Sequence, residues 1–259
     1  MRKIILIAVF TLILSLPSPG RAATVGNSAD TLGESWKFSL GLDYDMVFNR
    51  DLDNPDTSAN DDIKIKSNRL FLKGAVGVHP NIDLFLKLGM ADAKIESISG
   101  ADKYEYDGGM KFGFGLGAKV KIFEPMPGFR VMGDVQYLTY EVDNTVKVNG
   151  SDLKNSGVSS YTSNTKVTET QLALYVNQTI ERLSPYLGVK YSKLDGDVET
   201  NMTLSSGTRS VAKGKAGADN NFGIFAGTDI FIIPKQLSAT IEGRFLDETA
   251  GTIGIRYLF

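Results

Sequence analysis

Apolar and polar residues alternate along most of the chain, and the alternation begins at Trp36. Between Trp36 and Phe48 every even position is apolar or aromatic, whereas the odd positions include charged and small residues. The segment 109–123 repeats the pattern, with an apolar face from Met110 to Ile122 and an opposite face of lysine and glycine. Successive side chains of a β-strand point to opposite sides, so each segment predicts a strand with one oily and one polar face.

Ten segments of this kind follow one another. They cover approximately residues 36–48, 69–78, 82–90, 109–123, 128–142, 165–180, 185–198, 221–233, 236–247 and 250–259. The apolar faces of the first four and the last three carry no charged residue, although 22% of the chain is charged. A charge at the centre of a bilayer costs about 2–4 kcal/mol, which would explain the exclusion. Glu141 and Lys193 break the pattern in the fifth and seventh segments, and we expect Glu141 to lie above the membrane.

The connectors between the segments alternate in length. The long, polar ones cover residues 49–62, 97–108, 143–164 and 199–220, and the short ones cover 79–81, 124–128, 181–185 and 234–236. Only the last hairpin lacks a long connector. A soluble β-sandwich is the competing fold, but its strands average about five or six residues and turn their polar face outward. The pattern therefore favours a transmembrane, antiparallel, up-and-down β-barrel of about ten strands, with eight as the alternative.

The first 22 residues have the organisation of a signal peptide. Two positive residues precede a continuous apolar run from Ile4 to Leu16, and small residues follow up to Ala22. The run is shorter than the roughly 20 residues that a membrane-spanning helix needs. We therefore predict a cleaved signal peptide at 1–22, a periplasmic lead-in at 23–35 and a barrel domain at 36–259.

The last segment keeps its alternation up to the end of the chain. One face carries Ile253, Ile255, Tyr257 and Phe259. A terminal Phe preceded by apolar or aromatic residues at every second position resembles the C-terminal assembly signal of outer-membrane barrels. The whole chain resembles the small bacterial outer-membrane β-barrel families, the opacity-protein-like and porin-like surface proteins. The resemblance implies a protein in the outer membrane of a Gram-negative-type bacterium, inserted by the outer-membrane assembly machinery.

The polar faces of the segments predict a charged interior. In this register the charges that point into the barrel are Lys37, Asp43, Asp45, Arg69, Lys73, Asp83, Lys87, Lys111, Lys119, Lys121, Arg130, Asp134, Glu169, Lys190, Asp229, Glu242 and Arg244. An eight-stranded interior is filled by side chains, whereas an aqueous channel needs 16–18 strands, so a ten-stranded barrel lies near the filled limit. A narrow or gated pore is the alternative. Glycines on the fourth segment either make room for long side chains or leave a gap.

The residue inventory gives little support to catalysis. There is no cysteine, and the single histidine, His79, lies in a short connector. Omptin proteases, which also have ten strands, use carboxylates and a histidine at the outer rim, where this chain has no histidine. The stretch from Gly113 to Ala118 formally matches a dinucleotide fingerprint, but alternation continues where that motif needs a helix. The aspartates of 49–62 lack the spacing of a calcium loop. We expect no enzyme activity, no catalytic residue, no cofactor and no metal site.

We therefore predict a non-enzymatic surface barrel with a structural or adhesive role. Its partners would be outer-membrane lipid and lipopolysaccharide, the assembly machinery, and an extracellular ligand bound by the loops 49–62, 143–164 or 199–220. The formal net charge of −2 gives no general attraction to nucleic acid. The second hypothesis is a narrow or gated porin-like channel, and the third is a rim protease or lipid-modifying enzyme.

Overall fold

The computed structural model describes residues 30–53 and 62–259. The predicted signal peptide, residues 23–29 of the lead-in and residues 54–61 of the first connector lie outside the described residues. The strands are β1 (Phe38–Asp53), β2 (Asp62–His79), β3 (Ile82–Ser99), β4 (Asp102–Met126), β5 (Phe129–Val148), β6 (Ser151–Asp152), β7 (Val158–Gln178), β8 (Leu183–Leu204), β9 (Arg209–Ala218), β10 (Phe222–Ile233), β11 (Leu237–Phe245) and β12 (Thr249–Leu258). A short 3₁₀ helix, η1 (Leu153–Ser156), follows β6. No helix in the described part of the chain is long and apolar enough to span a bilayer.

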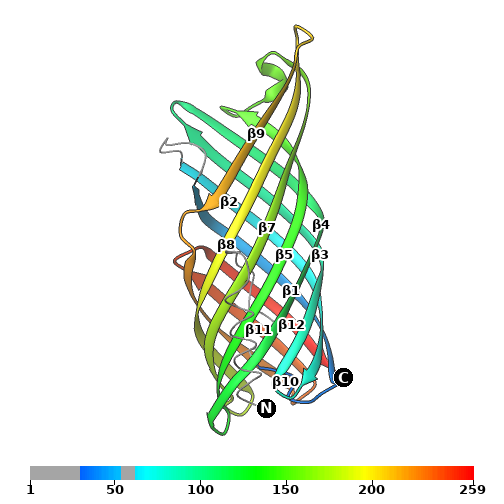
Figure 1. The fold of residues 1–259 in the computed structure, drawn as a ribbon, viewed down its shortest axis with the longest axis vertical. Coiled ribbons are helices and arrows are strands. Elements are labelled where there is room, and N and C mark those ends of the chain that lie inside the picture. The colour runs from blue at the N-terminus through cyan, green and yellow to red at the C-terminus, as the bar shows by residue number, and fades with distance from the viewer. Residues whose placement is uncertain (1–29, 54–61) are drawn as a thin grey trace, which may run out of the picture.

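The strands form one antiparallel sheet that closes on itself (Figure 1). Neighbours in sequence pair from β1 to β5, β5 pairs with β7, and β7 pairs with β8. β8 then pairs with β10, and β12 returns to pair with β1. The predicted up-and-down β-barrel is therefore confirmed. We call the end with the turns after β2, β4, β7 and β10 the short-turn end, and the opposite end the projecting end.

The barrel wall changes from ten strands to eight along its axis. β11 and β12 have only nine and ten residues, whereas β4 has 25. At the short-turn end β1 pairs with β12, but beyond the β11–β12 turn it pairs with β9 through Leu52 and Ala218. β9 and β10 pair with successive parts of the same edge of β8: β9 with residues 195–203 and β10 with residues 183–191. Figure 1 shows β10 to β12 confined to the lower part of the wall, and the β8–β9 hairpin extending farthest upward.

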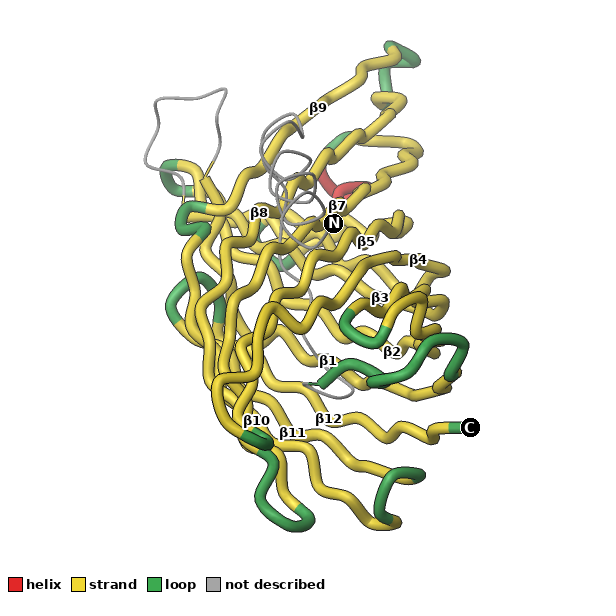
Figure 2. Tube along the Cα trace, turned by 60° about the horizontal axis from the view of Figure 1, so that its bottom comes forward, coloured by secondary structure: helices red, strands yellow, loops and turns green. Residues whose placement is uncertain are grey.

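Most of the stretches predicted as long loops are strands, which corrects that part of the sequence interpretation. Residues 97–108 belong to β3 and β4, which are joined by a turn at Gly100 and Ala101. The stretch 143–164 contains the ends of β5 and β7, and 199–220 contains the β8–β9 hairpin. Figure 2 shows how little of the chain at this end is loop. None of the charged residues in these stretches is buried, although the polar Asn144, Ser163 and Thr200 are. The backbones pair all the same, so polarity alone does not make these stretches loops.

Two apolar clusters lie inside the barrel. The larger one occupies the projecting half and includes Ile65, Phe71, Leu138, Val142 and Leu194. The smaller one lies nearer the short-turn end and consists of Met132, Ala173, Tyr175, Tyr186 and Phe225. Both clusters are formed by residues that follow the inward parity of their strands.

Glycines on the inner face make room for aromatic rings. A Cβ atom at Gly117 on β4 would lie 2.3 Å from Cζ of Phe85, and one at Gly188 on β8 would lie 2.7 Å from Cζ of Phe225. Real Cβ atoms do not approach other heavy atoms so closely. The space beside the inward glycines of β4, Gly113, Gly115 and Gly117, is therefore filled by neighbouring residues and is not a gap.

The residues before β1 close the short-turn end. Thr31 and Leu32 are buried, and the backbone N–H of Leu32 donates a hydrogen bond to Asp83 Oδ2 at 2.8 Å. Asp30 forms an ion pair of 2.7 Å with Arg130. Residues 30–32 of the lead-in are thus packed against the inside of the barrel wall, whereas residues 33–35 are exposed.

Candidate functional site

The polarity of the two faces reverses along individual strands. On β2, Leu70 and Leu72 point outward and Arg69 and Lys73 inward, but nearer the projecting end Lys64 and Lys66 point outward. There the inward residues of β2 are Ile63 and Ile65, which are buried. The barrel is therefore oily outside and charged inside in its lower part, and charged outside and apolar inside in its projecting part.

The oily outer surface forms a band around the lower part of the barrel. It contains exposed apolar side chains from the long strands other than β5, whose outward Val131, Val135 and Tyr137 are half-buried. Its edges are rich in aromatic residues: Trp36, Phe123 and Phe259 at the short-turn end, and Phe48, Phe112, Phe222 and Phe245 at the other edge. A closed barrel satisfies every backbone hydrogen bond within lipid, and aromatic girdles mark its two interfaces. The chain has the architecture of a small transmembrane β-barrel. Glu141 and Lys193, the two exceptions to the sequence pattern, point outward like the other charges of the projecting part.

A cluster of buried charges fills the barrel between the lower interior and the larger apolar cluster. We call it the charge belt, and it consists of four cations and five carboxylates: Arg50, Arg69, Lys190, Arg244, Asp45, Glu169, Glu242, Asp247 and Glu248. Each of the nine residues is exposed by 4% or less. Buried charges persist only when they are paired and hydrogen-bonded, so the belt depends on its internal contacts.

Arg244 on β11 contacts three carboxylates of the belt. Its Nε donates to Glu248 Oε1 at 2.7 Å, and its Nη1 lies 3.2 Å from Glu242 Oε1. Nη1 also donates to Thr252 Oγ1 at 2.7 Å, and Nη2 donates to Asp45 on β1. The guanidinium thus joins the last hairpin to the first strand, across the position at which the barrel closes.

The β11–β12 turn directs its two acids inward. Asp247 and Glu248 lie 2.9 Å and 2.5 Å from Nζ of Lys190 on β8. Arg50 Nη1 lies 3.7 Å from Glu248 Oε2, and Arg50 Nη2 donates to the backbone oxygen of Ser192 at 3.1 Å. The turn therefore closes the wall and at the same time supplies charge to the interior.

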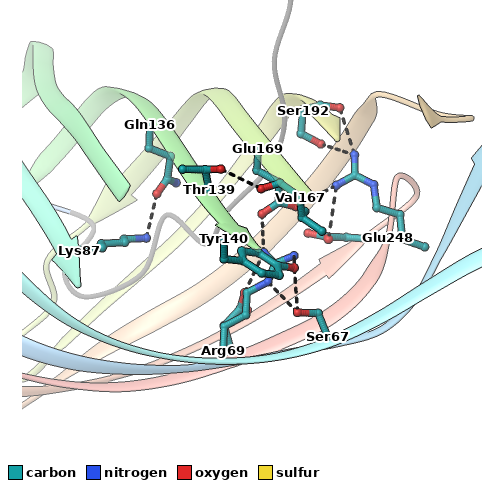
Figure 3. Close-up of polar contacts among 12 residues, drawn as sticks. Ser67, Arg69, Lys87, Gln136, Thr139, Tyr140, Val167, Glu169, Ser192 and Glu248 are labelled. Carbon is teal, nitrogen blue, oxygen red and sulfur yellow. Dashed lines mark hydrogen bonds and ion pairs between the residues drawn. The ribbon is translucent and has the colours of Figure 1, made fainter. Parts of the chain in front are cut away.

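A second group of contacts connects the belt to the apolar cluster above it. Arg69 on β2 pairs with Glu169 on β7, and Arg69 Nε donates to Ser67 Oγ at 3.1 Å. Ser67 Oγ lies 3.1 Å from the hydroxyl of Tyr140, whose ring belongs to the larger apolar cluster. Figure 3 shows these four side chains converging in the middle of the barrel. Charged heads and aromatic surface fill the cross-section together.

The interior below the belt is also charged. Lys87 Nζ donates to Gln136 Oε1 at 2.8 Å, and the ammonium group of Lys73 lies 4.2 Å from the centre of the Phe85 ring. A cavity of about 10 Å³ lies beside Lys73 and the residues before β1. This volume has room for about one water molecule. The interior is therefore packed at three levels: the short-turn end, the charge belt and the larger apolar cluster.

The structure places 13 of the 17 charges predicted to point inward in buried positions: Asp43, Asp45, Arg69, Lys73, Asp83, Lys87, Lys119, Asp134, Glu169, Lys190, Asp229, Glu242 and Arg244. The other four are not buried. Lys37, Lys121 and Arg130 are half-buried near the short-turn end. Lys111 is exposed and pairs with Asp143, because the β4 pairing is irregular between Gly108 and Gly113 and turns this side chain outward.

Three members of the charge belt were missed from the sequence: Arg50, Asp247 and Glu248. Arg50 lies in a predicted loop, but irregular pairing of β1 between Val47 and Arg50 shifts its parity and turns it inward. Asp247 and Glu248 lie in the only hairpin without a long connector. That missing connector was the one sequence signal that this turn differs from the others.

The outer surface of the projecting part carries paired charges. Lys66 Nζ on β2 donates to Glu96 Oε1 at 2.9 Å, and Lys103 Nζ on β4 lies 3.2 Å from Glu96 Oε2. Hydrogen bonds from both ammonium groups lower the pKa of Glu96 below its usual value of 4.5. The network ties three strands together outside the membrane.

His79 and the carboxylates of the charge belt lie at different levels of the barrel. His79 is the last residue of β2, and its Nδ1 accepts a hydrogen bond of 3.2 Å from the backbone N–H of Asn81 in the turn that follows. Across residues 30–53 and 62–259, no three His, Asp or Glu side chains form a group that could hold a metal ion. The inward carboxylates of the belt are buried and already paired, so an external substrate has no access to them.

Comparisons with known proteins describe the fold only. No family model and no curated protein matches the sequence. Among solved structures, the outer membrane protein OprG from Pseudomonas aeruginosa is 13% identical, with a TM-score of 0.44 over 89% of this chain and 99% of that chain. The outer membrane protease OmpT from Escherichia coli is 12% identical, with a TM-score of 0.48 over 86% of this chain and 95% of that chain. The translocator domain of autotransporter NalP from Neisseria meningitidis is 11% identical, with a TM-score of 0.44 over 97% and 93%.

Proposed function

We propose that the protein is a closed, non-enzymatic outer-membrane barrel that acts at the cell surface, as a structural element, an adhesin or both. The observation that carries this proposal is the packed interior. Nine buried charges fill the cross-section at the belt, and the larger apolar cluster fills it above. A barrel packed in this way gives solutes no path, so its function depends on its outer surface.

The surface available for binding is formed by the projecting hairpins. β3–β4 and β8–β9 are paired almost to their tips, so they present a stiff surface with short turns. β5 and β7 pair only as far as Asp143 and Asn164, and the end of β5 pairs with β6 instead. The outer ends of β7, β8 and β9 carry Ser, Thr, Asn and charged residues. Such residues suit contacts with polar ligands, with the lipopolysaccharide headgroups around the barrel, or with host surfaces.

The closed state is tested in planar bilayers. The refolded protein, with insertion verified by heat-modifiable gel mobility, is expected to give no discrete conductance steps. Steps in the wild-type protein would contradict the proposal.

The role of the hairpins is tested by shortening β8–β9. Deleting residues 200–212 and joining Glu199 to Lys213 through Asn-Gly removes whole β8–β9 pairs and also the β8 partners of β7 residues 158–163. The pairs below Glu199 stay in place. We expect bacteria with this variant to bind less to cell monolayers and immobilised matrix proteins. A control that replaces only the tip, 205–208, separates the tip from the strands. If both variants bind as well as the wild-type protein, the adhesive role is contradicted and only the structural role remains.

A narrow channel is the second candidate, and one observation favours it. The carboxylate oxygens of Asp43 and Asp134 are buried below the belt without a hydrogen-bond partner in the protein. Such groups are normally satisfied by ordered water, so the lower interior is partly hydrated. A channel would then require displacement of both the belt and the larger apolar cluster above it. A triple variant, Arg50→Ala with Glu248→Ala and Leu138→Ala, would conduct while the wild-type protein stays silent.

A further inference from the structure

An apolar groove runs along the lipid-facing surface of β1, β2 and β3 near the short-turn end. Its volume is about 540 Å³, and its lining includes Phe38, Leu40, Gly74, Leu84, Leu86 and Phe259. Gly74 pairs with Leu40 on one side and with Leu86 on the other. A Cβ atom at Gly74 would have no heavy atom within 4 Å. The groove therefore exists because the middle strand lacks a side chain between two leucines.

We propose that this groove holds one acyl chain of a membrane phospholipid. The groove lies inside the oily band, where the bilayer is the surrounding medium, and its walls are exposed hydrocarbon side chains. Leu40 and Leu86 stand on either side of the glycine and are 44% and 47% exposed. A flexible hydrocarbon chain fills such a space without desolvating any polar group.

The end of the groove has the character of a headgroup interface. The backbone N–H of Phe259 donates to the backbone oxygen of Phe38 at 3.0 Å, which fixes the C-terminal ring beside the groove. Trp36 lies two residues before Phe38, is 75% exposed, and has a φ of 65°. A bulky residue rarely adopts positive φ, and tryptophan is enriched at headgroup depth. The backbone N–H of Trp36 holds this conformation by donating to the backbone oxygen of Gly77 at 2.6 Å.

Lipid binding can be followed by the fluorescence of Trp36, because it is the only tryptophan in the chain. The folded full-length mature protein in dodecyl maltoside is titrated with phosphatidylcholine brominated at carbons 6 and 7 of one acyl chain. We expect quenching of Trp36 fluorescence that saturates at about one lipid per barrel. Gly74→Phe fills the groove and is expected to abolish the saturable part of the quenching. Gly74→Leu is a second filling variant, in case the first folds poorly.

Ala226→Phe is the matched control, because Ala226 on β10 also points outward at an exposed position. Its quenching is expected to saturate as in the wild-type protein. Quenching that rises in proportion to lipid, without saturation and equally in all variants, would overturn the proposal. Cross-linked dimers of the wild-type protein that disappear with Gly74→Phe, without saturable quenching, would also overturn it, since a second barrel would then occupy the groove. This proposal is independent of the surface function, because a closed or a conducting barrel could equally bind the chain.

Discussion

Lys190 on β8 and Glu248 in the β11–β12 turn form an ion pair of 2.5 Å inside the barrel. The pair joins the turn of the shortest hairpin to a strand of the long wall, at the height where ten strands become eight. Glu248 also contacts Arg50 and Arg244, so three cations from three strands converge on one carboxylate. The last hairpin is therefore attached through its turn as well as through its edges.

Removing this carboxylate should destabilise the barrel strongly. Glu248→Ala leaves Lys190, Arg50 and Arg244 buried with less compensation, and breaking a buried pair from one side costs about 3–5 kcal/mol. Urea unfolding in detergent micelles measures the loss. The control is Glu199→Ala, which removes an exposed partner of Lys213 and should cause no measurable change. Equal stabilities of the two variants would show that the belt does not hold the turn.

Adding a single methyl group at an inward-facing glycine should destabilise the barrel. Gly117→Ala places a Cβ 2.3 Å from Phe85 and 2.4 Å from the backbone oxygen of Val135, and such overpacking costs about 1–3 kcal/mol. Gly74→Ala is the matched control, because its Cβ would lie in open space. Unfolding midpoints compared under the same conditions test the difference. A Gly117→Ala barrel as stable as Gly74→Ala would mean that the interior is loosely packed.

The outer band can be located by lysine substitution. Leu72→Lys, in the middle of β2 and 47% exposed, should destabilise the protein in a bilayer by about 2–4 kcal/mol. Ile98→Lys, near the tip of the β3–β4 hairpin and 45% exposed, should change stability by no more than about 0.5 kcal/mol. The two aliphatic side chains have similar exposed fractions and differ in whether lipid or water surrounds them. Similar effects of both substitutions, measured by reversible unfolding in vesicles, would place the membrane elsewhere.

The Glu96 network should make the projecting hairpins sensitive to acid. Because the pKa of Glu96 is lowered on folding, its contribution to stability is complete above its ordinary value of 4.5 and is lost as the pH falls through the lower folded value. Glu96→Gln imitates the neutral form, so its local amide exchange in β3 and β4 should be faster than that of the wild-type protein at pH 7. The two should converge once the pH has fallen below the lowered folded pKa of Glu96. A difference that persists in acid would assign the effect to something other than the charge.

Much of the fold follows from the alternation of residues. In a strand the side-chain period is two, so the outward face of Trp36 to Phe48 or of Ile253 to Phe259 can be read without any knowledge of neighbours. The inward charges on regular strands, such as Asp45, Arg69 and Glu242, follow from the same rule. The direction of each of these side chains depends only on its place in its own strand, so the sequence alone predicts it.

Other features depend on contacts between distant segments. Irregular strand pairing changes the side of the wall to which Arg50 and Lys111 point. The neighbouring strands determine where this irregularity falls, and the residues themselves do not. In the sequence, the hairpins above the membrane resemble polar loops. Their inner faces are covered by other strands, and this happens only when the barrel wall closes.

The alternation along the chain determined that this protein is a barrel with an oily outer face and where each regular strand points. Only the tertiary structure decided that Arg50, Lys190 and Glu248 meet, that the wall narrows from ten strands to eight, and that the interior is packed. The physical reason is that side-chain direction is a property of one strand, whereas register, closure and the pairing of buried charges are properties of the whole ring.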